Sequence, residues 1–200
     1  RFETWRTFAH TTKLTKDTAY VDVESYITGN ISDPTTAVEI GIYDQRGSMI
    51  DERHMPAQDK VLLKTTLYVP KPKAWSPEEP NLYKLVTRIY KDNKVIDEQK
   101  TNIGLRTVSV SKENGFQLNG ITRKIKGVCL HHDLGPLGAA ENKAALIRQI
   151  KMMKEMGADA IRTAHNMPSQ WQMEICDSLG MMVMAESFDM WIYPKCKHGY

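Results

Sequence analysis

The sequence predicts a mixed β and α/β fold, in which a β-sandwich is followed by a segment of parallel strands and helices. Two observations support this fold class. Apolar residues recur at every second position across residues 18–110, and after residue 110 two helical patterns alternate with short apolar strands. The composition fits an ordered globular chain, because 41% of the 200 residues are hydrophobic and 26% are charged.

The first half has the period of strands with one face on a core and one face in water. Ala19, Val21 and Val23 alternate with Tyr20 and Asp22. The same pattern recurs at 38–42, 61–69 and 83–89, and residues that favour turns separate these segments at 29–30, 32–34, 45–47 and 91–94. About seven short strands with regular turns predict a sandwich.

The second half predicts strands that are joined by helices. Apolar strands are expected at 125–130, 159–163 and 182–185. A helix follows the first of them, from about Asn142 to a C-cap at Gly157. Its apolar face is formed by Leu146, Ile147, Ile150, Met153 and Met156.

A second helix follows Pro168, and Ser169 with Gln172 is expected to form a capping box at its start. Gly180 ends this helix, and the residues expected to be buried in it are Trp171, Ile175 and Leu179. Strands and helices that alternate with short connections predict parallel strands joined by right-handed crossovers. The period fits either a barrel or an open α/β sheet.

Polar side chains follow all three predicted strands at their carboxyl ends, which are the functional edge in either α/β architecture. The candidates are His131, His132 and Asp133 after the first strand, Arg162 and His165 at the second, and Glu186, Asp189 and Trp191 after the third. Three successive strands that deliver ionisable or aromatic groups to one rim predict a pocket for a polar substrate.

Structural roles are the alternative for the same residues. The histidines at 131–132 would cap backbone groups in their loop, and Arg162 would be a buried ion-pair partner with Glu186 as its counter-charge. A metal centre would require the rim histidines and Asp133 to converge. Because no ligand spacing of the zincin type is present, we expect no metal there.

Composition and charge argue against several classes of partner. The net charge is +3 and the basic residues are scattered among acidic ones, so no nucleic-acid partner is expected. No apolar run approaches the roughly 20 residues of a bilayer span, so no membrane partner is expected either. The three cysteines, Cys129, Cys176 and Cys196, match no zinc pattern and are expected to be buried thiols. The start at Arg1 and the end at Tyr200 suggest a piece of a longer protein.

Six motifs lie in a recognisable order along the chain. They are WSPEEPNLY at 75–83, IGLR at 103–106, FQLNG at 116–120 with IKGVCLH at 125–131, AIRTAHNMP at 160–168, CDSLGM at 176–181 and VMAE at 183–186. Together they resemble the motifs of family 2 glycoside hydrolases of the β-galactosidase kind, over nearly the whole chain. Three departures leave the choice of sugar open: Cys129 replaces the usual Asn, Asn166 and Met167 interrupt a Tyr-Pro pair, and Ala185 replaces an Asp.

The resemblance implies a fold with three parts. Residues 1–14 would be the connection from an N-terminal jelly-roll domain, residues 15–110 an immunoglobulin-like β-sandwich, and residues 111–200 a truncated (β/α)8 TIM barrel with its first three strands. The family contains retaining hydrolases of β-linked sugars, most often β-galactosides in bacterial carbohydrate metabolism. Its two catalytic glutamates follow the fourth strand and a later strand. No residue here is therefore expected to be catalytic, and the isolated chain is expected to be inactive.

The resemblance also implies residue roles and partners. Arg162 matches an arginine that hydrogen-bonds the nucleophile, and His165 matches a histidine that contacts the glycone. The full set of implied substrate-binding residues is His131, Arg162, His165, Glu186, Asp189 and Trp191. The implied partner is a β-linked oligosaccharide or glycoside, in the periplasm or cytoplasm of a bacterium. No cofactor is expected in this fragment, and the resemblance leaves a divalent cation in the full-length enzyme open. The unpaired strand edges of a truncated barrel predict self-association as a homo-oligomer.

Two other functions are compatible with parts of the sequence. An immunoglobulin-like module could bind carbohydrate or protein without catalysis, and it would then need exposed aromatic side chains on one sandwich face; Trp75 is instead expected to pack at an edge. An open α/β enzyme with a nucleotide cofactor would need a glycine-rich turn after the first parallel strand. Residues 130–138 lack that arrangement and contain Pro136, so this class is not favoured.

Overall fold

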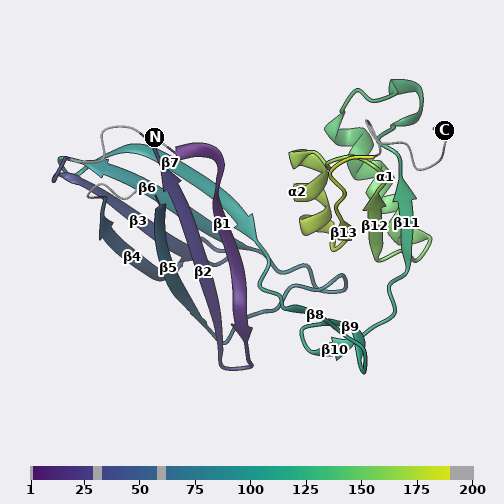
Figure 1. Cartoon of the computed structure of the whole chain (residues 1–200), viewed down its shortest axis with the longest axis horizontal. Coiled ribbons are helices and arrows are strands. Elements are labelled where there is room, and N and C mark those ends of the chain that lie inside the picture. Colours follow the sequence, from purple (N-terminus) through teal and green to yellow (C-terminus); the bar gives the residue numbers. More distant parts are fainter. Residues whose placement is uncertain (1, 29–32, 58–61, 190–200) are drawn as a thin grey trace, which may run out of the picture. The chain divides into compact units, whose positions relative to one another are not determined.

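The computed structural model describes residues 2–28, 33–57 and 62–189, with side chains from residue 7 onward. The chain divides into two compact units, residues 1–123 and residues 124–200 (Figure 1). Both predicted parts of the fold are confirmed, since the first unit is an antiparallel β-sandwich and the second is a parallel β/α segment. Within the described residues, no helix combines the length and the apolar character that a membrane span needs.

The sandwich consists of two antiparallel sheets that face each other (Figure 1). One sheet has the order β1-β2-β5, formed by Phe2–Leu14, Thr18–Ile27 and Leu62–Pro70. The other has the order β4-β3-β6-β7, formed by Met49–Pro56, Thr36–Tyr43, Tyr83–Lys91 and Lys94–Ile103. The apolar side chains alternate as predicted, and both sheets contribute to one core that includes Val21, Ile40, Leu67 and Leu85.

The N-terminal segment corrects one expectation from the sequence. Residues 2–14, which the family resemblance assigns to a connection, form strand β1 at the edge of the first sheet, with Phe8 opposite Glu24 and Ala9 opposite Val23. Ala9 and Leu14 pack against the core while Phe8 is exposed. The segment therefore has the alternation of a half-buried strand, and the backbone of β2 supplies its hydrogen-bond partners.

A small sheet belongs to the first compact unit, which ends at residue 123, whereas the domain division expected from the sequence falls at residue 110. Its strands are β8 (Val108–Ser111), β9 (Gly115–Leu118) and β10 (Ile121–Thr122). Asn119 binds it to the sandwich, because its Oδ1 accepts from the Thr107 amide at 3.0 Å and its Nδ2 donates to the Trp75 carbonyl at 3.0 Å. Trp75 is 2% exposed, as expected for a packed edge residue, and the Arg106 guanidinium lies over its ring at 4.9 Å.

The second unit is a parallel sheet of three strands, in the order β11-β12-β13 (Figure 1). The strands are Gly127–Leu130, Ala160–Thr163 and Met182–Met184, joined by a 3-10 turn at Gly135–Leu137 and by helices α1 (Lys143–Glu155) and α2 (Gln170–Leu179). Val128, Ile161 and Val183 form one cross-strand row and pack against both helices. The adjacent row of Cys129, Arg162 and Met184 lies on the other face of the sheet.

Local capping explains where the two helices begin and end. Asn142 caps α1 by accepting from the Ala145 amide at 3.0 Å, and Ser169 caps α2 by accepting from the Gln172 amide at 3.1 Å. Gly180 ends α2 in the left-handed conformation, as predicted. The Lys154 ammonium also donates to the carbonyls of Leu179 and Gly180 at that end.

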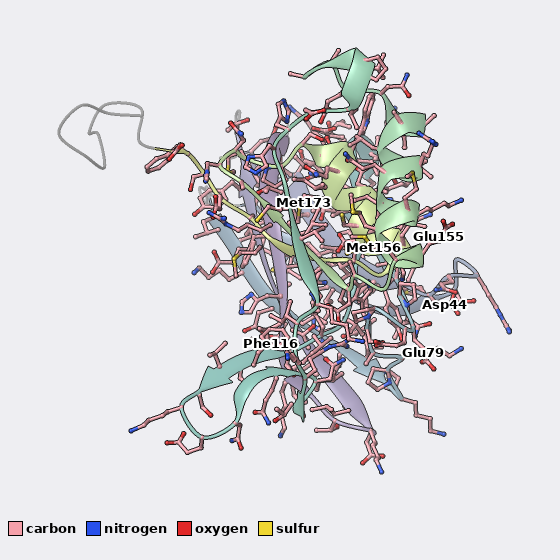
Figure 2. All side chains as sticks on the ribbon, turned by 90° about the vertical axis from the view of Figure 1, so that its right-hand side faces the viewer. Asp44, Glu79, Phe116, Glu155, Met156 and Met173 are labelled. Carbon is pink, nitrogen blue, oxygen red and sulfur yellow. The ribbon has the colours of Figure 1, made fainter. Side chains whose placement is uncertain are left out.

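Three burial predictions for the second unit are wrong. Trp171 is 42% exposed, because the core contacts of α2 begin one turn later at Ile175. Met156 is 63% exposed; it follows the last residue of α1 as its C-cap, beside Glu155 in Figure 2. Cys129 is exposed, whereas Cys176 is buried as expected, and this burial raises the pKa of its thiol to about 12. The third cysteine, Cys196, lies outside the described residues.

Candidate functional site

The candidate site lies at the carboxyl ends of the three parallel strands. Arg162 occupies the second-to-last position of β12, in register with Cys129 on β11 and Met184 on β13. The side chains of this row face away from the helices that cover Ile161. The register therefore places Arg162 between Cys129 and Met184, beside the loops that follow the strands, where a barrel or an open sheet binds its substrate.

Arg162 and Glu186 form the first polar group of the site. The guanidinium donates through Nε to Glu186 Oε1 at 2.5 Å and through Nη1 to Cys129 Sγ at 3.6 Å. The hydrogen bond to Glu186, and then the one to Cys129, raise the pKa of Arg162 above its ordinary value. The two side chains are 41% and 25% exposed, so Glu186 is the counter-charge that the sequence suggested, although the ion pair is open to solvent and not buried.

The hydroxyl of Thr163 holds the backbone of Glu186, which is one member of the Arg162–Glu186 pair. The amide of Glu186 donates to Thr163 Oγ1 at 3.0 Å, and Thr163 itself is 5% exposed. Neither Thr163 nor Cys129 was predicted as a site residue. Thr163 adjoins Arg162 in sequence, but its partner is a backbone amide 23 residues further along, and no local pattern could indicate that contact.

His131, His165 and Asp189 form the second polar group. The rings of His131 and His165 are 5.9 Å apart between centroids and inclined at 65°, an edge-to-face arrangement. His165 Nδ1 lies 3.9 Å from Asp189 Oδ2, within ion-pair range but beyond hydrogen-bond distance. His165 is half-buried at 24% side-chain exposure, and the peptide bond that precedes it is cis.

The other rim candidates are placed differently. Asp133 supports its own loop, because its Oδ1 accepts from the Gly135 amide at 2.7 Å and its carbonyl accepts from Gln149 Nε2 at 3.2 Å. His132 is exposed and, together with Asp133, lines a small cleft that also contains Glu141 and Gln149. Trp191, the remaining candidate, lies outside the described residues. The structure therefore places five of the six predicted substrate-binding residues in two groups and leaves the sixth undecided.

The metal ligands considered at the rim do not converge within the described part of the chain. The one group of three or more possible ligands found there is in the sandwich, where atoms of Glu39, Glu52 and His54 lie within 4.8 Å of one another. Glu39 is already neutralised, since Arg88 Nη1 lies 2.5 Å from its Oε1 and the Tyr90 hydroxyl donates to its Oε2 at 2.8 Å. This cluster is explained as a cross-strand ion-pair network without a cation.

The surface that a carbohydrate-binding module would need is partly present on the sheet β1-β2-β5. Phe8 is 61% exposed and Tyr68 is 43% exposed. One face of each of two tyrosine rings is covered by a cation, however, because Arg53 lies 5.4 Å from the ring centroid of Tyr68 and Lys13 lies 5.5 Å from that of Tyr20. A sugar ring stacks on an open aromatic face, so these two tyrosines are poorly placed for that role.

The fold is a β-sandwich followed by a parallel β/α unit, and charged and imidazole side chains lie at the carboxyl edge of its strands. Comparison with models of known families identifies the family. Residues 6–106 match the model for glycosyl hydrolases family 2, and residues 108–190 match the model for the TIM barrel domain of the same family. The chain belongs to glycosyl hydrolase family 2.

Individual relatives agree with this family but differ in their named activities. The chain is 36% identical to the β-galactosidase BoGH2A of Bacteroides ovatus, over 98% of this chain and 24% of that protein. It is 40% identical to a putative β-glucuronidase of Formosa agariphila, over 92% of this chain and 18% of that protein. A crystal structure of a family 2 member from Bacteroides cellulosilyticus aligns with a TM-score of 0.88 and 40% identity, over 95% of this chain and 27% of that one. The chain thus spans between 18% and 27% of the length of these relatives.

Proposed function

We propose that the protein to which this chain belongs is a retaining glycosidase that removes terminal β-linked sugars, with β-galactosides as its preferred substrates. The observation that carries the proposal is the rim of the parallel sheet, where Arg162 is held by Glu186 beside the group of His131, His165 and Asp189. Fixed charges and imidazole groups at this edge suit a ligand that is rich in hydroxyl groups.

The preference for a galactoside over a glucuronide rests on charge. Two carboxylates, Glu186 and Asp189, belong to the described rim, and the guanidinium of Arg162 is already paired with one of them. A neutral glycone donates hydroxyl hydrogens to carboxylates, whereas the carboxylate of a uronic acid would be repelled by them. The relatives support either sugar by name, since one is a β-galactosidase and another a putative β-glucuronidase.

The chain's own residues would bind and orient the substrate and leave the bond-breaking step to groups outside it. A retaining mechanism needs two carboxyl groups roughly 5 Å apart, one as nucleophile and one as acid and base. We assign both to barrel strands beyond residue 200. Arg162 would donate hydrogen bonds to the nucleophilic carboxylate and keep it ionised, because a fixed positive charge lowers the pKa of a nearby carboxyl group. His165 would contact a hydroxyl of the glycone.

Hydrolysis of a panel of nitrophenyl β-glycosides tests this proposal. The 200-residue chain should be inactive, whereas the protein extended to the end of its barrel should act best on the galactoside. In the extended protein, Arg162→Lys should lower kcat/KM by roughly a hundredfold, because a point charge replaces a planar fork of donors. The matched control is Arg148→Lys, at an exposed position on α1, which should leave kcat/KM unchanged. Turnover by the short chain alone, or a glucuronide preference, would contradict the proposal.

We also propose that the isolated chain self-associates. Strands β11 and β13 each have one neighbour in the described sheet, so each presents an unpaired edge to which a second copy could add a strand. Light scattering over a range of concentrations should give a mass that rises above that of a monomer. A monomeric mass at the highest concentration would refute self-association and leave the proposed activity untouched.

A further inference from the structure

One buried hydroxyl next to the rim has no role in the function proposed above. Thr163 is the last residue of β12 and is 5% exposed, and its Oγ1 accepts a hydrogen bond from the amide of Glu186 at 3.0 Å. The paired register between β12 and β13 ends one residue earlier, at Arg162 and Met184. The hydroxyl therefore takes up a backbone N–H just beyond the end of the strand ladder, where no further ladder pair exists.

The Arg162–Glu186 pair needs such support. Both side chains are partly exposed, and an exposed ion pair is a weak constraint because solvent screens it and the long arginine side chain loses rotamer freedom. The second contact of Arg162, to Cys129 at 3.6 Å, uses a sulfur atom, which is a weak acceptor. Glu186 Oε1 at 2.5 Å is thus the principal anchor of the guanidinium, and the position of Glu186 depends on its backbone.

Thr163 is well suited to fix that backbone. Its side chain is branched at Cβ, so few χ1 rotamers are available and the hydroxyl direction is constrained. Its main chain is held in the sheet by pairing with Leu130 on β11. A rigid donor–acceptor contact therefore runs from the sheet to the amide of Glu186, and the carboxylate of the same residue reaches Arg162.

We propose that Thr163 is a positioning residue, whose hydroxyl fixes the backbone at Glu186 so that the Glu186 carboxylate holds Arg162 by Nε and directs the rest of the guanidinium toward the substrate site. Within the described residues, Arg162 donates through Nε and Nη1 to Glu186 and Cys129, and its Nη2 donates to neither. The Nη2 hydrogens would then be available to a carboxylate or a sugar oxygen. The structural part of this inference stands by itself, and its consequence for turnover rests on the proposed function.

Nuclear magnetic resonance of the 200-residue chain, at a concentration where light scattering gives a monomeric mass, tests the structural part. In Thr163→Val, which keeps the shape and loses the hydroxyl, exchange of the Arg162 Nε–H proton with water should accelerate about tenfold, whereas Thr163→Ser should stay within about twofold of the wild type. Arg88, whose Nε donates to Glu98 at 2.8 Å in the sandwich, is an internal control that should not change. An unaltered Arg162 signal in Thr163→Val would overturn the inference. If Thr163→Val does not fold, Thr163→Ser provides the test. Exchange of the Arg162 Nε–H proton that is much faster in Thr163→Ser than in the wild type, although the hydroxyl is retained, would overturn the inference as well.

Kinetics of the extended protein test the consequence. Thr163→Val should lower kcat/KM about tenfold and Thr163→Ser should restore it to within about twofold, while the matched control Thr66→Val, which removes a hydroxyl bonded to Asp22 in the sandwich, should have no effect. In a protein that already carries Glu186→Gln, Thr163→Val should lower kcat/KM only slightly further, because both changes act on the contact between Glu186 and Arg162. Full activity in Thr163→Val, or effects that multiply with Glu186→Gln, would refute the role in turnover. A wild-type protein without any β-glycosidase activity would instead refute the proposed function, and the resonance experiment would still decide the positioning of Arg162.

Discussion

Replacement of Trp75 by alanine should strongly destabilise the sandwich unit and spare the β/α unit. Trp75 is 2% exposed, and truncation of a buried tryptophan to alanine costs about 3–5 kcal/mol. The contact between its ring and the Arg106 guanidinium at 4.9 Å would add about 0.5–1 kcal/mol. The expected loss of about 3.5–6 kcal/mol is a large part of the roughly 5–15 kcal/mol that stabilises a domain.

Urea unfolding with two probes measures this effect. Both described helices belong to the second unit, so the helical circular dichroism signal follows that unit, and resolved amide signals from β2 follow the sandwich. Trp75→Ala should lower the midpoint of the sandwich signal alone, and Trp75→Phe should do so by less than half as much. Trp171→Ala is the matched control, since Trp171 is 42% exposed and its loss should cost less than about 1 kcal/mol. Equal small shifts for Trp75→Ala and Trp171→Ala would refute the packing argument.

Three further outcomes are expected. Gly104→Ala should destabilise the sandwich by about 1–3 kcal/mol in the same urea assay, because a Cβ at residue 104 would lie 2.7 Å from Trp75 Cγ; an unchanged midpoint would contradict this. Hydrogen bonds from Arg123 hold the pKa of Glu78 at about 2 instead of 4.5. The contribution of this ion pair to the stability of the fold is therefore present above about pH 4.5 and is lost as the pH falls toward 2. A titration of Arg123→Gln followed by nuclear magnetic resonance should show a raised Glu78 pKa. Ile150 is fully buried, so Ile150→Val should lower the unfolding free energy of the second unit by about 1 kcal/mol and Ile150→Ala should lower it by about 3 kcal/mol. Equal losses for the two variants would argue against a cavity.

The elements of the fold could be predicted because their signals are local. Alternation places Val21 and Val23 on the buried face of β2, since side chains on a strand point to opposite faces in turn. Ser169 and Gly180 mark the ends of α2 through contacts and backbone angles within one helical turn. The same local reasoning fails at Trp171, where helix periodicity predicts a face but not how far the neighbouring core extends along it.

The candidate site could be predicted as a rim but not as a set of contacts. The carboxyl ends of parallel strands lie on one edge by topology, so Arg162, His165 and Glu186 were expected near one another. Their division into an Arg162–Glu186 group and a group of His165 with His131 and Asp189 depends on the register of the strands and on the path of each loop.

The sequence by itself determined the order of a β-sandwich and a parallel β/α segment, the helix ends and the family, because these depend on periodicity, caps and ordered motifs. Tertiary structure alone decided that residues 2–14 form an edge strand, that Asn119 ties the small sheet to Trp75, and that Thr163 holds the amide of Glu186. These contacts join residues from 5 to 44 positions apart in the sequence. Such pairs are chosen by strand register and by the need of every buried donor and acceptor for a partner, and neither is encoded in a short stretch of chain.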